Sequence, residues 1–583
     1  MAQLRIALAQ INTTVGDIEG NAELVVRWTR RATEEGAHLV AFPEMTLTGY
    51  PVEDLALRAS FVEASARAVG ELAARLAAAG LGETAVVVGF LNGREDMAHS
   101  LGAPRNGLAV LYQGEVTLVS AKHHLPNYGV FDEFRYFVPG MTLPVVRVRG
   151  VDIAMVICED LWQEGGPAAA VRASGAGLLL VLNGSPYERD KDDARLELCH
   201  RRAREAGSAL AYVNLVGGQD ELVFDGDSLV VDANGSLVAR GPQFEEALLV
   251  TDLELPAGSE PAPSSLSAGA TGIAIRGHTL SETPVPSYAP RPAPLAERLA
   301  DPAEIYAALV LGTRDYVRKN RFGSVLLGLS GGIDSALTAT IAVDALGPDL
   351  VHAVLMPSRY SSDHSIDDAE ELVRRQGVHS RTVAVGPMVD AFEAAIDVDG
   401  LAAENLQARV RGQLLMTLSN QEGHLVVTTG NKSELATGYS TLYGDSAGGF
   451  APIKDVWKTM VWELARWRNA QAQAAGRQAP IPENSIVKPP SAELRPGQLD
   501  TDSLPDYPVL DALLDDYVGT DLGRAELIAA GHDEKLVDRV IRLVDRAEYK
   551  RRQYPPGPKV SKRNFGRDRR LPITNRWSAP SGT

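Results

Sequence analysis

A short loop of small residues, placed between a predicted strand and a predicted helix, constrains the fold more than any other feature of the chain. The apolar run 324–329 ends in Ser330-Gly331-Gly332, and Ile333-Asp334-Ser335 leads into an alanine-rich helical pattern. Small residues let the backbone close around an anion, and free N–H groups at a helix N-terminus favour phosphate. No Lys-Ser or Lys-Thr follows the glycines, so this is not the common GxxxxGKS/T loop. The alternative is a plain turn without a ligand.

The pattern around this loop alternates between helix and strand. A helix is predicted over 302–319, followed by the strand, the loop and the next helix, and then by a strand over 351–356, a helix over 366–376 and a strand over 380–385. Successive βαβ units predict a doubly wound, Rossmann-like parallel sheet. Its ligands are expected at the carboxyl ends of the strands.

The first part of the chain has a different pattern. Strands are predicted over 5–8, 39–42, 86–90, 153–157, 178–182 and 211–215, with helical stretches between several of them. Asn234-Gly235 between two apolar runs predicts a hairpin. The mixture predicts an α/β layered fold with some antiparallel pairing. Residues 255–300 are rich in Pro, Ala, Ser and Gly and predict an extended linker between domains over 1–254 and 301–583.

Composition restricts the class of protein. The 583 residues exceed what one core organises. The net charge of −18 disfavours nucleic acid or an anionic membrane as partner, because both are bound by basic surfaces. No apolar run approaches about 18 residues, the length of a transmembrane helix. The N-terminus lacks signal-peptide features, and Cys158 and Cys199 are the only cysteines, so the sequence predicts a cytoplasmic protein without a disulfide framework.

Three segments of the first half predict a cysteine nucleophile. The predicted strand Leu39–Phe42 is followed by Pro-Glu44, segment 121–133 contains Lys122 and Glu133, and Cys158 directly follows a predicted strand. A carboxylate can take the proton of a thiol, and a lysine can lower the pKa of the thiol or bind an oxyanion. Each segment alone has a simpler explanation: a strand end, a surface lysine, or a small buried cysteine.

Together and in this order, the three segments resemble the Glu-Lys-Cys triad of the nitrilase superfamily. The resemblance covers roughly residues 1–250 and implies an α-β-β-α sandwich that hydrolyses carbon–nitrogen bonds through a thioester. It implies Glu44 as general base, Lys122 as oxyanion stabiliser and Cys158 as nucleophile, with Glu133 matching a second glutamate beside the lysine. Cys199 lies in a helical pattern and is expected to be structural.

The segment around 183–191 and Tyr128 extend this resemblance to the glutamine-hydrolysing branch of the superfamily. In that branch, the residues that match Tyr128, Ser185 and Lys191 bind the amino acid. Residues 214–226 resemble the same branch. The resemblance therefore implies glutamine as the amide substrate.

Four further segments follow the phosphate loop. They are 404–411 in a helical pattern, 428–434 after a strand, the glycine-rich 443–455, and 549–553 with the basic tail behind it. Asn405 and Arg409 lie one turn apart on one helix face. Taken singly, these segments also agree with a charged helix face, a turn, a loop and a solvated tail.

The loop resembles the Ser-Gly-Gly-x-Asp-Ser signature of the ATP pyrophosphatases, and the whole set resembles the NAD synthetases of that group. With the nitrilase-like half in front, the chain resembles the glutamine-dependent branch of that family over nearly its full length. Such enzymes adenylate the nicotinate carboxylate of deamido-NAD with ATP and Mg²⁺, and ammonia from glutamine then displaces AMP to give NAD. Two sites on either side of a linker imply an enclosed passage for ammonia.

The resemblance assigns residues to each ligand. The implied ATP-binding residues are Gly328, Leu329, Ser330, Gly331, Gly332, Ile333, Asp334, Ser335, Thr429 and Lys454. Asn405, Glu434 and Lys550 are implied to bind deamido-NAD, and Asp334 and Glu434 to hold the Mg²⁺ that accompanies ATP. No tightly bound organic cofactor is expected.

The resemblance also implies a homo-oligomer, at least a dimer through the second half, with an octamer left open. Two other functions agree with parts of the sequence. One is a related amidotransferase that activates a different acid, as GMP-synthetase-like enzymes do with a different glutaminase half. The other is a metabolite-sensing protein that has lost catalysis, against which the intact Glu44, Lys122, Cys158 and Asp334 argue.

Overall fold

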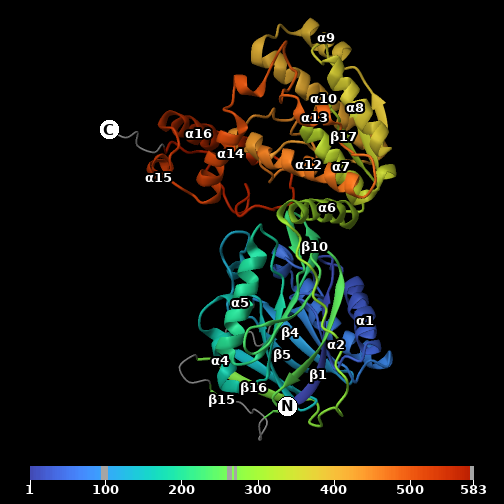
Figure 1. The fold of residues 1–583 in the computed structure, drawn as a ribbon, viewed down its shortest axis with the longest axis vertical. Helices are drawn as coiled ribbons and strands as arrows, with labels where there is room; N and C mark the ends of the chain where they lie inside the picture. Colours follow the sequence, from blue (N-terminus) through green and yellow to red (C-terminus); the bar gives the residue numbers. More distant parts are fainter. Residues whose placement is uncertain (94–102, 259–265, 268–271, 578–583) are drawn as a thin grey trace. The chain divides into compact units, whose positions relative to one another are not determined.

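The computed structural model describes residues 1–93, 103–258, 266–267 and 272–577 of the chain (Figure 1). The chain forms two compact units. Unit 1 comprises Met1–Gln219 and Phe224–Leu299, and unit 2 comprises Asp220–Val223 and Ala300–Thr583. Each unit is described by itself below.

Unit 1 is built on two mixed sheets. The first has the order β14-β1-β2-β3-β4-β5, with β1, β2 and β3 parallel and the other pairs antiparallel. Its strands are β1 (Ala2–Gln10), β2 (Leu39–Ala41), β3 (Ala85–Asn92), β4 (Arg105–Tyr112), β5 (Glu115–Ala121) and β14 (Ala247–Leu255). The predicted strands over 5–8, 39–42 and 86–90 are confirmed here.

The second sheet has the order β13-β12-β9-β8-β7-β6-β16-β15, with β7, β8 and β9 parallel. Its strands are β6 (Thr142–Val148), β7 (Val151–Ile157), β8 (Leu178–Asn183), β9 (Ala209–Asn214), β12 (Leu229–Val231), β13 (Leu237–Arg240), β15 (Leu266–Ser267) and β16 (Ala274–Thr279). The hairpin at Asn234-Gly235 is confirmed, since β12 and β13 pair antiparallel on either side of it. A separate hairpin joins β10 (Val216–Gln219) to β11 (Leu222–Asp225).

The two sheets pack face to face, because side chains alternate along each strand. In β1, Leu4, Ile6 and Leu8 join the core shared with Ile153 and Ile157 of β7. The opposite face of the first sheet packs on α1 (Ile18–Glu34) and α2 (Ala59–Ala78), and that of the second on α4 (Gly166–Ser174) and α5 (Lys191–Ala206) (Figure 1). The α-β-β-α sandwich is therefore confirmed.

The segment expected as a linker is partly structured. Ala274–Thr279 forms β16, which pairs in parallel with β6, and Ile273 and Ile275 are buried. Contacts place the described residues of 255–299 within unit 1. The sequence signal was weak because most residues of β16, which lies between β6 and β15, are exposed.

Unit 2 contains a four-stranded parallel sheet with the order β19-β18-β17-β20. The strands are β17 (Val325–Gly328), β18 (Val351–Leu355), β19 (His379–Thr382) and β20 (Leu425–Val426). The helices of its first part are α6 (Asp301–Lys319), α7 (Ile333–Leu346), α8 (Asp363–Gln376), α9 (Gly386–Ala395), α10 (Gly400–Glu422), α11 (Lys432–Thr437), α12 (Lys458–Ala474) and α13 (Glu483–Val487). The predicted doubly wound parallel sheet is confirmed.

The C-terminal part of unit 2 is a small helical cluster with its own apolar core. It contains α14 (Tyr507–Leu514), α15 (Arg524–Ala529), α16 (Glu534–Arg546) and α17 (Glu548–Arg551) (Figure 1). Lys559 and Arg569, in the basic tail, are buried. The solvated-tail alternative is therefore wrong for this stretch.

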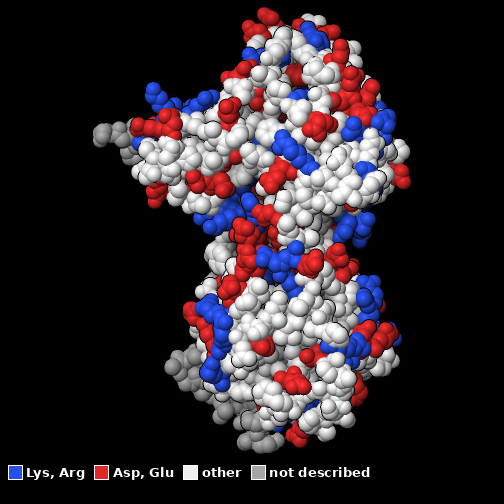
Figure 2. Space-filling model, in the orientation of Figure 1, with Lys and Arg blue, Asp and Glu red and all other residues white. Residues whose placement is uncertain are grey.

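Charge and hydropathy in the structure agree with the composition. In the view of Figure 2, lysine and arginine are interspersed with aspartate and glutamate over the described residues rather than gathered into one basic face. None of the helices among the described residues combines the length and apolar character needed to cross a bilayer.

Candidate active sites

Glu44, Lys122 and Cys158 come together at one edge of unit 1 because each directly follows the carboxyl end of a strand or its short extension. Glu44 lies three residues beyond β2, Lys122 one beyond β5 and Cys158 one beyond β7. All three are buried. Cys158 has a φ of 43° and begins α3 (Glu159–Trp162). A left-handed backbone at a non-glycine residue is strained, and such strain is concentrated at functional sites.

Lys122 lies between two buried carboxylates. Its Nζ donates to Glu44 Oε1 at 2.7 Å and to Glu133 Oε1 at 3.0 Å. Asn106 Nδ2 donates to Glu44 Oε1 at 2.6 Å, and the backbone N–H of Gly184 donates to Glu44 Oε2 at 2.8 Å. Both oxygens of Glu44 are therefore held in place. The order of motifs predicted Glu44, Lys122 and Glu133, but Asn106 and Gly184 carried no signal in the sequence.

The electrostatics of this cluster keep the thiol protonated at rest. Burial, and then the charge of Glu44, raises the pKa of Cys158 well above its ordinary value, although Lys122 opposes the shift. Burial alone lowers the pKa of Lys122, but the carboxylates of Glu133 and Glu44 outweigh burial and raise it well above its ordinary value. A thiol in this state becomes a nucleophile only when a base removes its proton, and the charge of Glu44 acts directly on Cys158.

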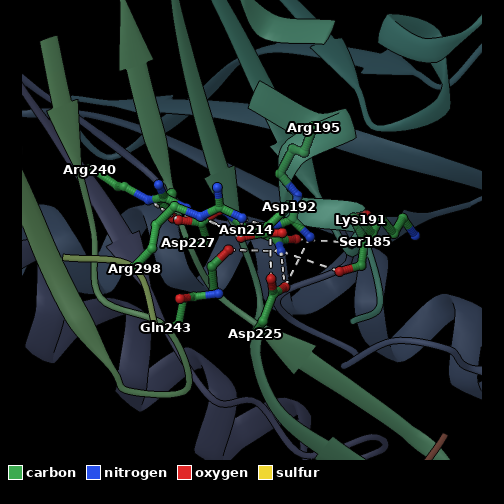
Figure 3. Close-up of polar contacts among 12 residues, drawn as sticks. Ser185, Lys191, Asp192, Arg195, Asn214, Asp225, Asp227, Arg240, Gln243 and Arg298 are labelled. Carbon is green, nitrogen blue, oxygen red and sulfur yellow. Dashed lines mark hydrogen bonds and ion pairs between the residues drawn. The ribbon is translucent and has the colours of Figure 1, made fainter. Parts of the chain in front are cut away.

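The three residues expected to bind glutamine lie around this cluster. Ser185 is buried and directly follows Gly184, which contacts Glu44. Lys191 is the first residue of α5, and its Nζ donates to Pro186 O at 3.0 Å; Figure 3 shows Lys191 beside Ser185. Tyr128 is largely exposed, and its hydroxyl donates to Glu159 Oε2 at 3.0 Å. Glu159 directly follows Cys158 and was not among the predicted site residues.

The predicted phosphate loop connects β17 to α7 in unit 2. Gly331 has a φ of +77°, and a Cβ at this position would lie 2.1 Å from Ser365 O, so only glycine fits. Ser330 Oγ lies 3.1 Å from Ser335 Oγ, and Ser335 Oγ donates to Gly332 O at 3.0 Å. The loop is thus closed by its own hydroxyls at the N-terminus of a 14-residue helix, where the helix dipole favours an anion.

A second buried lysine meets the acids of this loop. Lys458 Nζ contacts Asp334 Oδ2 and lies 3.7 Å from Glu434 Oε1. Asn431 Nδ2 donates to Asp334 Oδ1 at 2.8 Å, and Asn431 also caps α11, which carries Glu434. Burial, and then the charge of Asp334, raises the pKa of Glu434 to about 8. Two carboxylates, one lysine and the phosphate loop therefore meet at one place.

Lys458 was not among the predicted site residues. It is the first residue of α12 and is buried. A lysine in the first turn of a helix is unfavourable with respect to the helix dipole. That conflict was the available signal that Lys458 is held there by acidic partners.

Most of the remaining residues of unit 2 that were expected to bind ATP or deamido-NAD contact groups other than Asp334 and Lys458. Lys454 is buried, but its Nζ pairs with Glu221 Oε1 at 2.7 Å rather than with an acid of the phosphate loop. Asn405 on α10 accepts from Thr441 Oγ1 at 2.7 Å. Lys550 Nζ donates to Gly438 O and Ser440 O, each at 2.6 Å. Thr429 is half-buried two residues before Asn431.

Asp334 beside the phosphate loop and Glu434 on α11 fit Mg²⁺ brought by a nucleotide. Asp334 and Glu434 converge on one ammonium group, which shows that both can face a single cation. Mg²⁺ is usually held by one or two carboxylates together with substrate phosphates. Among the described residues, no group of three or more His, Cys, Asp or Glu forms a metal cage. A cation shared with bound phosphates therefore suits the donor set.

Known protein families match each half of the chain separately, and known proteins match both halves together. Residues 5–260 match the carbon-nitrogen hydrolase family, and residues 305–554 match the NAD synthase family. The chain is 43% identical over 604 residues to the glutamine-dependent NAD(+) synthetase of Thermotoga maritima, covering 100% of each chain. It is 42% identical to that of Acinetobacter baylyi, covering 99% of each.

Solved structures of other proteins match this chain over nearly its full length. A glutamine-dependent NAD+ synthetase from Acinetobacter baumannii, in complex with ADP, is 40% identical, has a TM-score of 0.72, and is matched over 99% of this chain and 100% of that one. One from Cytophaga hutchinsonii, at 22% identity and a TM-score of 0.78 over 98% of each chain, shows the same fold.

Proposed function

The chain belongs to the family of glutamine-dependent NAD+ synthetases, and from this premise we propose that it makes NAD from deamido-NAD, ATP and glutamine. One observation carries the proposal. A single chain holds a buried Cys-Glu-Lys cluster suited to amide hydrolysis, and a phosphate loop with two converging carboxylates suited to nucleotide chemistry. A ligase that uses glutamine as nitrogen donor requires both.

In unit 1, Cys158 Sγ attacks the side-chain amide carbon of glutamine while Glu44 takes the thiol proton. The oxygen of the tetrahedral intermediate gains negative charge, which the Lys122 ammonium stabilises. The carbon–nitrogen bond then breaks, and protonated Glu44 gives its proton to the leaving nitrogen, which departs as ammonia. Water, deprotonated by Glu44, hydrolyses the thioester to glutamate and restores the thiol.

In unit 2, the nicotinate carboxylate of deamido-NAD attacks the α-phosphorus of ATP, and the bond to pyrophosphate breaks. The backbone N–H groups and hydroxyls of 330–335 bind the phosphates. Mg²⁺, when bound by Asp334 and Glu434, neutralises charge on those phosphates. Adenylation turns the carboxylate, a poor electrophile, into a good one. Ammonia then attacks the acyl carbon of the adenylate, AMP leaves, and the attacking nitrogen loses a proton to give the amide.

Lys458 belongs to this second reaction in the proposal. Its ammonium lies against both Asp334 and Glu434 and neutralises their charge. In the proposal, this ammonium pairs with a phosphate oxygen when the nucleotide and its cation bind. We therefore assign Lys458, and not Lys454, whose Nζ pairs with Glu221, to the ATP phosphates.

The test is direct. The full chain is incubated with ATP, Mg²⁺ and deamido-NAD, with either glutamine or an ammonium salt, and NAD, AMP and glutamate are measured. NAD and AMP in equal amounts from both nitrogen sources support the proposal. Turnover only with another carboxylic acid would favour the related amidotransferase, and tight binding without turnover would favour the metabolite sensor.

Three further statements stay predictions. They are the cytoplasmic location, the homo-oligomer, and the passage that carries ammonia to the adenylate. Light scattering tests the homo-oligomer. An ammonia-consuming enzyme added to the medium, such as glutamate dehydrogenase with its co-substrates, tests whether ammonia escapes before it reaches the adenylate.

A further inference from the structure

A buried polar network lies behind Ser185 and Lys191, and its inner member is Asn214 (Figure 3). Asn214 ends β9 and is fully buried. Its Oδ1 accepts from the backbone N–H of Ser185 at 3.0 Å, and its Nδ2 donates to Ser185 O at 3.3 Å. One side-chain amide therefore holds both backbone groups of Ser185 and fixes the direction of its side chain.

Asn214 connects Ser185 to a buried ion pair. Its Nδ2 also donates to Asp225 Oδ1 at 3.3 Å, and Asp225 receives Arg195 Nη1 at 2.8 Å and Arg195 Nη2 at 3.0 Å. The arginine is 0% exposed and the aspartate 1%. Such a two-pronged pair fixes orientation as well as distance.

Arg195 carries the connection to α5. It lies four residues after Lys191, so the two residues are one turn apart on the same helix. The first turn of α5 is also held from another direction, since Asp192 receives Arg298 Nε at 2.8 Å. A continuous set of bonds thus runs from Ser185 through Asn214, Asp225 and Arg195 to the helix that begins with Lys191.

This network is a costly way to stabilise a fold. Buried ion pairs lose much of their attraction to desolvation, and apolar residues of similar volume often give equal or greater stability. What apolar residues do not provide is fixed orientation. The network therefore indicates a requirement for geometry at Ser185 and Lys191.

We propose that Arg195, acting through Asp225 and Asn214, is a positioning residue for the amino-acid end of glutamine. It holds Ser185 and Lys191 at a fixed distance from each other and from Cys158, so that the bound amide carbon lies at the sulfur. The inference rests on the proposed function of unit 1. It predicts an effect on glutamine binding and not on the chemistry of the thiol.

The test compares Arg195→Lys with Arg147→Lys in the full chain. Lysine keeps the charge but loses the two-pronged bond. Arg147 is a matched control, because it makes an equally buried two-pronged pair with Asp152, at 2.8 and 3.0 Å, at the far end of β7 from Cys158. We expect Arg195→Lys to raise the KM for glutamine about tenfold or more while kcat falls less than about threefold. Arg147→Lys should leave that KM within about twofold.

A second readout separates positioning from general damage to unit 1. Iodoacetamide is a small amide without an amino-acid end, so its rate of reaction with Cys158, followed by peptide mapping, reports the thiol environment alone. That rate should be unchanged in Arg195→Lys, as should NAD synthesis from ammonium. An equal loss of iodoacetamide reactivity and of glutamine turnover would overturn the proposal, as would an equal rise in KM in the control variant.

A second substitution keeps the test decisive if Arg195→Lys does not fold. Asn214→Ser removes the bonds to Ser185 O and Asp225 without leaving a new buried charge, and it should also raise the KM for glutamine; an unchanged KM overturns the proposal. Failure of the proposed function is recognised separately, because the unaltered chain would then not hydrolyse glutamine at all.

Discussion

Two buried lysines, one in each unit, are each placed between two carboxylates, but the two clusters differ in how open they are. In unit 1, the side chains of Lys122, Glu44 and Glu133 are 1%, 0% and 4% exposed. In unit 2, Lys458 is 2% exposed, but Asp334 and Glu434 are each 19% exposed. All three side chains of the first cluster are thus shielded from solvent, whereas the second leaves its two acids partly accessible.

The difference follows from the chemistry proposed for each site. Amide hydrolysis needs a permanent nucleophile, base and cation, and all three are side chains held at fixed positions. Adenylation takes much of its positive charge from the cation that accompanies ATP. A site of that kind must be open to the nucleotide, and Lys458 balances the charge of its two acids. Four substitutions test this comparison, in order of decreasing expected effect.

Removal of the nucleophile should affect one unit only. Cys158→Ala should lower glutamine-dependent NAD synthesis by about 10⁴-fold or more, because no other group can form the thioester. Ammonia-dependent synthesis should remain near normal, since the phosphate loop is untouched. Cys199→Ala, at the other buried cysteine of unit 1, is the control and should retain both activities. Retained glutamine activity in Cys158→Ala would remove this residue from its role, and loss of both activities would indicate misfolding.

Asp334→Asn should instead abolish synthesis from both nitrogen sources. Loss of a carboxylate that faces the cation and phosphates removes several kcal/mol of transition-state stabilisation, roughly 10²- to 10³-fold in rate. AMP release is the measurement, together with covalent labelling of Cys158, which should persist. Asp344→Asn is the control, because Asp344 lies on the same helix but pairs with Arg468 at 2.9 Å. Near-normal AMP release in Asp334→Asn would refute the assignment.

The assignment of Lys458 rather than Lys454 to the ATP phosphates can be tested by replacing each lysine in turn. Lys458→Met should lower AMP formation about 10²-fold and raise the KM for ATP, because a charge that reaches a phosphate contributes a few kcal/mol. Lys454→Met should leave the KM for ATP within about threefold, since its partner is Glu221. If Lys454→Met raised the KM for ATP more than Lys458→Met did, Lys454 would be the ATP-binding residue, as expected from the sequence.

The smallest effect is a change in pH dependence. Burial raises the pKa of Glu133 to about 7, despite the opposing charge of Lys122. Below that pH the carboxyl is protonated and no longer supports the Lys122 ammonium, so kcat/KM for glutamine should rise as the pH increases through about 7. Glu133→Gln should flatten this rise and lower the plateau about tenfold. An unchanged profile in the variant would show that another group titrates there. The control is the ratio of variant to unaltered chain in ammonia-dependent synthesis, which should stay constant over the same range because the supply of free ammonia cancels.

Much of the fold and of both sites was predictable because the signals are local. Apolar runs of strand length gave the strands that precede Glu44 and Cys158, and a residue that follows a buried strand has little freedom in where it lies. The strand that precedes Lys122, β5, was not among the predicted strands. The phosphate loop was predictable for the same reason, since Gly331 has a conformation and a close contact that only glycine allows. The order of these motifs then gave the family.

The contacts that cross the sheets were not predictable. Asn106 and Gly184 hold Glu44 from β4 and from the end of β8, and no spacing in the sequence relates them. Lys454 and Lys458 are four residues apart, and only the packing of α12 decided that the second reaches Asp334.

The sequence by itself determined the two units, their sheets, the loop 330–335 and the position of Cys158 after a buried strand, because periodicity, glycine and the residue after a strand act over a few neighbours. The tertiary structure alone decided which buried charges meet: Lys458 with Asp334, Lys454 with Glu221, and Arg195 with Asp225 behind Ser185. The physical reason is that a buried charge must be paired. The identity of the partner depends on how distant segments pack, and hydropathy patterns do not predict that packing.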